Sequence, residues 1–103
     1  MDKYDVFELT GGRGRPAATL VVVLQHRLLS DLQTVVVAPL AALHATEKTP
    51  RLRPNVRIAG RTLQLQIDRL AAVERRSLGI RVGDVIADSD RIDLAIAMLL
   101  NGF

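Results

Sequence analysis

The sequence predicts a mostly β protein of the α+β class, a small SH3-like barrel closed by a C-terminal α-helix. Three observations lead to this prediction: short β-branched runs in the first half, an alternating pair of segments joined by a tight connection, and one apolar segment at the carboxyl end. Several short strands followed by a single helix are typical of a small, partly open barrel or an SH3-like sheet.

The first half of the chain contains the candidate strands with the most β-branched residues. Tyr4–Leu9 can form a strand, and Gly11–Pro16 breaks every periodicity, so a mobile loop is expected there. Ala18–Leu24 and Thr34–Val37 are too short and too continuously apolar for amphipathic helices. We therefore expect strands that are buried on both faces or at an interface.

The middle of the chain is predicted to be irregular. Pro39 is expected to end the second β-branched run, because proline has no backbone N–H for a strand ladder. Leu40–Leu43 can then form a brief helical turn. Thr46–Pro54 contains two further prolines, which favours irregular structure.

The second half begins with a predicted β-hairpin. Asn55–Ile58 and Thr62–Ile67 alternate polar and apolar residues, and Ala59–Arg61 connects them tightly. Leu70–Val73 can extend the sheet. Leu78–Gly83 contains two glycines and is interpreted as a turn-rich approach to the final helix.

The final segment is predicted to be an α-helix that is apolar nearly all round. Between Ile92 and Leu100 the only polar residue is Asp93, which complements the positive end of the helix dipole. Such a helix must be covered on more than one side. Its cap is expected from the side chain of Asp88, Ser89 or Asp90.

Composition indicates a single domain that covers residues 1–103. Hydrophobic residues make up 49% of the chain and charged ones 24%, which is ordinary for a globular protein. The first nine residues have no targeting pattern, and no apolar run approaches the roughly 20 residues that span a bilayer. The sequence therefore predicts a cytoplasmic protein without a membrane segment.

Few residues suggest catalysis or metal binding. The chain has no cysteine, and its two histidines, His26 and His44, cannot complete a zinc site of three or four ligands. No serine or cysteine near them has the spacing of a nucleophile, and the acidic residues from Asp84 to Asp93 lack the EF-hand pattern. We expect no catalytic residue, no metal and no cofactor.

The positive charge is carried mainly by arginine, since Lys3 and Lys48 are the only lysines and the net charge is +3. Guanidinium groups suit carboxylates and phosphates alike, so an acidic partner is expected. Aromatic residues that could stack on bases are nearly absent. Sequence-specific nucleic-acid binding is therefore not expected, although six arginines could form a phosphate-binding face: Arg51, Arg53, Arg57, Arg61, Arg75 and Arg76.

The last five residues, Leu99–Phe103, end on a large apolar side chain, which is unusual because chain ends normally fray. In one interpretation Phe103 folds back over a glycine-capped turn. In the other, the tail enters another protein. The sequence leaves both open.

Several stretches resemble the CcdB family of bacterial toxins in order and spacing, and the resemblance extends from Tyr4 to Phe103. They are Leu24–Asp31, Val35–Ala41, Leu52–Gly60, Leu78–Gly83, Arg91–Ile92 and Ala95–Phe103. The resemblance implies the toxic half of a plasmid or chromosomal toxin–antitoxin pair. It also implies an SH3-like barrel with a C-terminal helix, assembled as a two-fold dimer.

CcdB-like toxins that poison gyrase insert the ends of their C-terminal helices into the dimerisation region of the gyrase A subunit. They stabilise a cleaved DNA complex without performing chemistry, and a disordered antitoxin removes them. The resemblance therefore implies three partners, namely the DNA gyrase A subunit, a cognate antitoxin and a second copy of the chain. It implies no enzymatic activity.

The resemblance also assigns gyrase-binding candidates by position. Gly102 and Phe103 match the penultimate glycine and the apolar last residue of the gyrase-binding tail. Leu28 and Leu29 match an aliphatic pair that flanks the gyrase-binding surface, with ordinary rim leucines as the alternative.

Two further candidates depart from the family pattern. Asn101 stands where the best-known gyrase poison has a tryptophan, and Ala97 where it has an asparagine. Loss of a tryptophan anchor commonly costs about 2 kcal/mol or more of binding free energy. Three functions therefore stay open: a gyrase-binding toxin, a ribonuclease toxin of related fold that uses the arginine surface, and a non-toxic relative that binds only the antitoxin.

Overall fold

A computed structural model describes residues 1–10, 19–29, 31–43 and 51–102. The strands are β1 (Asp5–Leu9), β2 (Leu20–Val23), β3 (Thr34–Ala41), β4 (Asn55–Ile58), β5 (Arg61–Leu65), β6 (Ala71–Glu74) and β7 (Leu78–Asp84). Short 3-10 turns separate some of them: η1 (Arg27–Leu29), η2 (Ile67–Arg69), η3 (Arg75–Ser77) and η4 (Ile86–Asp88). A single α-helix, α1, covers Ser89–Asn101 in the described part of the chain.

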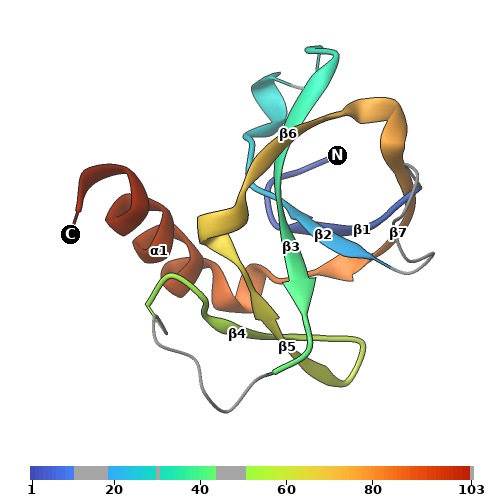
Figure 1. The fold of residues 1–103 in the computed structure, drawn as a ribbon. Helices are drawn as coiled ribbons and strands as arrows, with labels where there is room; N and C mark the ends of the chain where they lie inside the picture. The colour runs from blue at the N-terminus through green and yellow to red at the C-terminus, as the bar shows by residue number, and fades with distance from the viewer. Residues whose placement is uncertain (11–18, 30, 44–50, 103) are drawn as a thin grey trace.

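The strands form one curled antiparallel sheet in the order β4-β5-β3-β2-β1-β7, with β6 paired to β3 as well. Figure 1 shows the sheet curling into a half-barrel, with α1 projecting from its side and the carboxyl end at the outer tip of the helix. The predicted fold, a mostly β barrel closed by a C-terminal helix, is confirmed.

The strands β2 and β3 carry buried side chains on both faces, as the β-branched runs predict. Val22 belongs to the main core, which α1 covers with Ile92 and Ala95. Its neighbours Val21 and Val23 point the other way into a second apolar cluster inside the curl of the sheet. Because successive side chains of a strand alternate between faces, a continuous valine run fits a position with apolar surroundings on both sides.

Pro39 does not end its strand, so the prediction of a stop there and of a helical turn over Leu40–Leu43 is wrong. β3 continues to Ala41, and its first half pairs with β6 while its last residues pair with β5. The Pro39 carbonyl accepts a 2.9 Å hydrogen bond from the N–H of Gln66 near this change of partner. A missing donor disrupts the ladder least where the ladder is already interrupted.

The predicted hairpin is confirmed as β4 and β5. Ile58 pairs with Arg61, so only Ala59 and Gly60 form the connection. Both have positive φ angles, 52° and 78°, as a two-residue type I′ turn requires. The second strand ends at Leu65, before the predicted Ile67.

Leu78–Gly83, predicted to be turn-rich, lies instead within the seven-residue strand β7, which pairs with β1. Its glycines permit close packing. A Cβ at Gly79 would lie 2.8 Å from Thr10 Cγ2, and one at Gly83 would lie 2.8 Å from Ile58 Cδ1. Glycine was interpreted as a turn signal because sequence alone does not show this crowding.

The helix α1 follows η4 directly and is only partly covered by the barrel. The predicted side-chain cap is wrong: no side chain caps its first turn. Asp88 instead accepts a 3.4 Å hydrogen bond from the N–H of Arg57 and pairs with Arg91. Ile92 and Ala95 are buried, whereas Leu94 is 63% exposed. No helix in the described ranges is long and apolar enough to cross a membrane.

Candidate functional site

The N-terminal segment holds the first half of α1 against the barrel. The Tyr4 hydroxyl donates to the Asp93 carboxylate, 2.8 Å from both oxygens, and Lys3 Nζ lies 3.0 Å from the same group. Burial and this hydrogen bond raise the pKa of Tyr4. Burial lowers the pKa of Lys3, but the hydrogen bond and charge of Asp93 raise it overall. Asp93 therefore attaches α1 to the segment that precedes β1.

Tyr4 adopts an uncommon backbone conformation, with φ at 77°. Its N–H donates to the carbonyl of Val23 at 2.7 Å, and its carbonyl accepts from the N–H of Val85 at 3.0 Å. These bonds hold the residue between β2 and the segment that leads into α1. The strained conformation is thus part of the attachment of the helix.

Among the described residues, no side-chain hydrogen bond or ion pair holds the carboxyl end of α1, although Leu99 packs against the main core. Leu100 is 71% exposed, and Asn101 and Gly102 are exposed as well. Gly102 has a φ of 81°, and its N–H donates to the Met98 carbonyl at 2.8 Å, which is a left-handed helix cap. The helix therefore ends in an ordered turn that faces solvent.

Two other predicted tail residues are less informative. Ala97 is partly buried, on the third turn of α1. Phe103 lies outside the described residues, so whether it folds back or points outward stays a prediction.

Leu28 and Leu29 are exposed by 81% and 51% in the short turn η1. The turn is ordered by its own backbone: Leu29 N–H donates to the His26 carbonyl at 3.0 Å, and Leu28 N–H donates to His26 Nδ1 at 3.1 Å. The Gln25 side chain links this turn to β3: it donates to the Leu29 carbonyl at 3.2 Å and accepts a hydrogen bond from the N–H of Val36 at 3.3 Å. The two leucines are thus held outward on a fixed turn.

The two groups of gyrase-binding candidates lie on different parts of the chain. In Figure 1, η1 lies at the upper rim of the curled sheet, and the end of α1 projects to one side. No hydrogen bond within the described ranges joins η1 to α1. Sequence reasoning placed both groups at the surface but could not show how they are related.

The six arginines of the predicted phosphate-binding face do not form one face. Arg51 and Arg53 line a groove with Arg91, which sequence reasoning did not include. Arg75 and Arg76 line a separate pocket at the start of β3. No sequence pattern links residues 51–53 to Arg91, because the fold alone brings them together.

The pocket at the start of β3 measures about 620 Å³ and is lined by Gln33, Thr34, Glu74, Arg75 and Arg76. Arg75 Nη2 donates to the carbonyl of Leu32, and Arg76 pairs with Glu74. Arg75 Nε is buried without a hydrogen-bond partner in the described structure. Buried donors normally have a hydrogen-bond partner, so this unpaired Nε is an exception.

The remaining candidates do not assemble into a chemical site. His26 serves the η1 turn, and His44 lies outside the described residues. Across residues 1–10, 19–29, 31–43 and 51–102, no three histidine or acidic side chains gather as metal ligands would.

The curled sheet with its terminal helix defines the protein's structural class, a small β-barrel closed by a C-terminal helix. Within that class the chain belongs to the CcdB family, because the family model described as "CcdB protein" matches residues 3–102. The family resemblance seen in the sequence is thus confirmed. A comparison of the sequence with curated proteins found no match.

Solved structures with the same fold include three toxin-type proteins of low sequence identity. An endoribonuclease in complex with its cognate antitoxin, from a mycobacterial species, is 18% identical, has a TM-score of 0.79, and aligns over 97% of this chain and 94% of its own. The Mycobacterium tuberculosis toxin MazF-mt6 is 16% identical, with a TM-score of 0.72 and coverages of 94% and 96%. A MazE–MazF structure from Deinococcus radiodurans is 12% identical, with a TM-score of 0.76 and coverages of 98% and 95%.

These structures correct the expectation that the protein is not an enzyme. Proteins described as endoribonucleases share the fold over nearly the whole chain. The barrel with its terminal helix is therefore compatible with catalysis, and the exclusion of enzymatic activity, which came from the lack of a recognisable catalytic motif and from the resemblance to gyrase poisons, is withdrawn.

Proposed function

We propose that this protein is the toxin of a toxin–antitoxin pair and that it binds the DNA gyrase A subunit through the end of α1. The observation that carries the proposal is the exposed, glycine-capped helix end formed by Leu100, Asn101 and Gly102. Membership of the CcdB family supports gyrase as the target. Such a target places the protein's action in the cytoplasm.

Binding in this proposal blocks topoisomerase turnover by wedging the helix end into the target. Leu100 supplies apolar area and Asn101 an amide that can donate and accept hydrogen bonds. The proposal also places Phe103, which follows the left-handed Gly102 in sequence, in the interface. Without a tryptophan at position 101 the affinity should be lower than that of a tryptophan-anchored tail.

A second copy of the chain and an antitoxin complete the proposed assembly. Leu94 is 63% exposed in the single chain, and a dimer mate would cover part of this apolar helix surface. In a two-fold dimer, Leu28 and Leu29 of one copy can flank the helix end of the other. The mycobacterial endoribonuclease bound to its cognate antitoxin supports the proposal of an antitoxin here.

The experiment is a titration of the purified gyrase A subunit with wild-type protein, Leu100→Ala and Ile80→Ala. Leu100 and Ile80 are each 71% exposed, so the second variant controls for loss of exposed apolar area. Leu100→Ala should weaken binding about tenfold, and Ile80→Ala should leave it unchanged. The proposal would be contradicted if the wild type did not bind, or if both variants weakened binding equally.

A second candidate function is RNA cleavage, and the pocket around Arg75 favours it. Glu74 could take the proton of a ribose 2′-hydroxyl as its oxygen bonds to phosphorus and the bond to the 5′-oxygen breaks. The 5′-oxygen would take a proton from water. Arg75 and Arg76 would stabilise the charge on the phosphate oxygens.

This candidate is tested by incubating pure protein with RNA in the absence of gyrase. Cleavage should be lost in Glu74→Gln and retained in Arg61→Gln, because Arg61 is exposed and does not line the pocket. Intact RNA after prolonged incubation with the wild type would eliminate the second candidate and leave the first untouched.

A further inference from the structure

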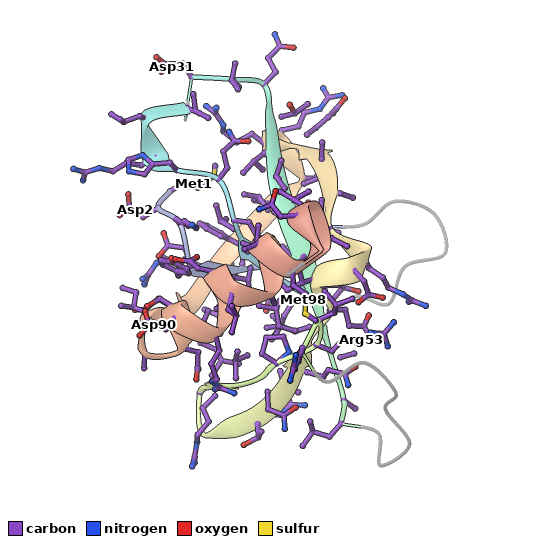
Figure 2. All side chains as sticks on the ribbon, turned by 90° about the vertical axis from the view of Figure 1, so that its left-hand side faces the viewer. Met1, Asp2, Asp31, Arg53, Asp90 and Met98 are labelled. Atoms are coloured by element: carbon purple, nitrogen blue, oxygen red, sulfur yellow. The ribbon has the colours of Figure 1, made fainter. Side chains whose placement is uncertain are left out.

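An apolar groove lies inside the curl of the sheet, on the face opposite α1. Figure 2 looks onto α1, on which Asp90 and Met98 are labelled, and shows the sheet behind the helix. The groove measures about 290 Å³ and shares no residue with α1 or with the two arginine pockets. Eight residues line it: Leu9, Thr19, Val21, Val37, Pro39, Arg69, Ala71 and Val73.

The strand register explains why these side chains face the groove together. Val21 pairs with Pro39 between β2 and β3, and Val37 pairs with Ala71 between β3 and β6. Residues paired across neighbouring strands project from the same face of a sheet. Val21 and Val37 are buried and belong to the second apolar cluster, as does Leu9. The floor of the groove is therefore made of aliphatic side chains.

The hollow exists because β6 has a small residue on this face. Ala71 stands opposite Val37, and the next inward residue of the strand is Val73. Ala71 is exposed, although its partner Val37 is only 3% exposed. Small barrels are normally filled by their own side chains, so a hollow over a buried floor is an exception. A larger side chain at position 71 would fill it.

The lining has one charged side chain, Arg69, at the end of η2. Arg69 is exposed, and its guanidinium makes no hydrogen bond or ion pair with the residues that the structure describes. Its neighbour Asp68 accepts two hydrogen bonds from Arg53, of 2.9 and 2.8 Å. Because the adjacent carboxylate is already paired with Arg53, the positive charge of Arg69 is available to an anion.

An aliphatic floor beside one guanidinium suits a ligand with an apolar body and a single negative charge. Water fits poorly, because a bound water needs at least two polar partners. An apolar cavity of about 150 Å³ holds benzene, so this groove has room for roughly ten carbon atoms. One guanidinium matches one carboxylate through two parallel hydrogen bonds, whereas a phosphate ester would bring more charge than Arg69 balances.

We propose that this groove binds a free medium-chain fatty acid, with its alkyl chain on Val21, Val37 and Ala71 and its carboxylate at Arg69. The proposal does not depend on gyrase binding, because no lining residue belongs to α1 or η1. A ligand that binds only the folded protein stabilises it. The fatty acid should therefore raise the melting temperature.

The test is a calorimetric titration with decanoate, decanol and decylamine, each below the concentration at which it forms micelles. The three probes share one alkyl chain and differ in charge, and the wild type should bind decanoate most tightly. Ala71→Ile should weaken decanoate binding about tenfold or more by filling the groove. Ala72→Ile is the matched control and should not weaken it, because Ala72 is exposed on the other face of β6.

Variants of Arg69 test the charge separately. Arg69→Gln should weaken decanoate binding about three- to fivefold and leave decanol binding unchanged. Arg69→Glu should reverse the preference, so that decylamine binds more tightly than decanoate. Because Arg69 is exposed, both variants should fold, and the reversal decides the proposal even if Ala71→Ile does not fold.

The proposal would be overturned if the wild type did not bind decanoate, or if it bound decylamine equally well. Equal effects of Ala71→Ile and Ala72→Ile would also overturn it. A change of oligomeric state in Ala71→Ile without any ligand would assign the groove to a second copy of the chain instead. A rise in melting temperature with decanoate that Ala72→Ile keeps and Ala71→Ile loses would support the proposal.

Discussion

The two ends of α1 differ in what holds them. In the first half, Asp93 is bound by Tyr4 and Lys3, and Ile92 and Ala95 are buried in the main core. At the far end Leu99 still packs against the main core, but Leu100, Asn101 and Gly102 face solvent, and the Gly102 N–H closes the last turn on the Met98 carbonyl. The helix is therefore fixed at its base and available at its tip, as expected of an element that presents a binding surface.

The largest effect on stability is expected at the base of the helix. Ile92 is fully buried, so Ile92→Ala should lower the free energy of unfolding by about 2–5 kcal/mol. Leu100→Ala removes an exposed side chain and should change it by less than about 0.5 kcal/mol. Urea denaturation of both variants measures the contrast, and similar losses would show that the tip is as firmly packed as the base.

The next largest effect is expected at η2, on which α1 packs. Hydrogen bonds from Arg53 lower the pKa of Asp68 below 3.8, so this pair stabilises the folded state above about pH 4. The contribution is lost as the pH falls through the folded-state pKa. Asp68→Asn should therefore cost about 1–2 kcal/mol at pH 7 and progressively less in more acidic solution.

Denaturation of wild type and Asp68→Asn across the acidic range checks this sign. A difference that stays constant down to pH 2 would mean that the carboxylate's charge is not what stabilises η2.

The smallest effect on stability is expected at the N-terminal attachment. Tyr4→Phe removes one partly exposed hydrogen bond to Asp93 and should cost about 1 kcal/mol. Because Ile92 still anchors the helix, binding at its tip should change little. Loss of gyrase binding with unchanged stability would show that Tyr4 acts on the tip, which would break the distinction between the two ends.

The sequence was sufficient for the parts of the fold that depend on local pattern. Valine runs predicted β2 and β3, and alternation around Gly60 predicted the hairpin. The sequence was insufficient where tertiary contacts determine the local structure. Pro39 lies inside a strand because β3 changes partner nearby, and a Cβ at either of the β7 glycines would lie 2.8 Å from the side chain of Thr10 or Ile58.

The same division applies to the candidate sites. The helix tip was predicted from the unusual ending of the chain, and its residues 100–102 are exposed. The arginine groove was missed, because Arg91 joins Arg51 and Arg53 only through the packing of α1. The roles of Leu28, Leu29 and Ala97 stay predictions, since nothing in one chain tests them.

The most direct test of a fixed base and a functional tip is a variant that ends at Leu100. It should have the melting temperature of the wild type, because the core contacts of Ile92 and Ala95 are intact. It should also lose growth arrest and gyrase-mediated DNA cleavage. Full toxicity in the truncated variant, at an unchanged melting temperature, would contradict the account.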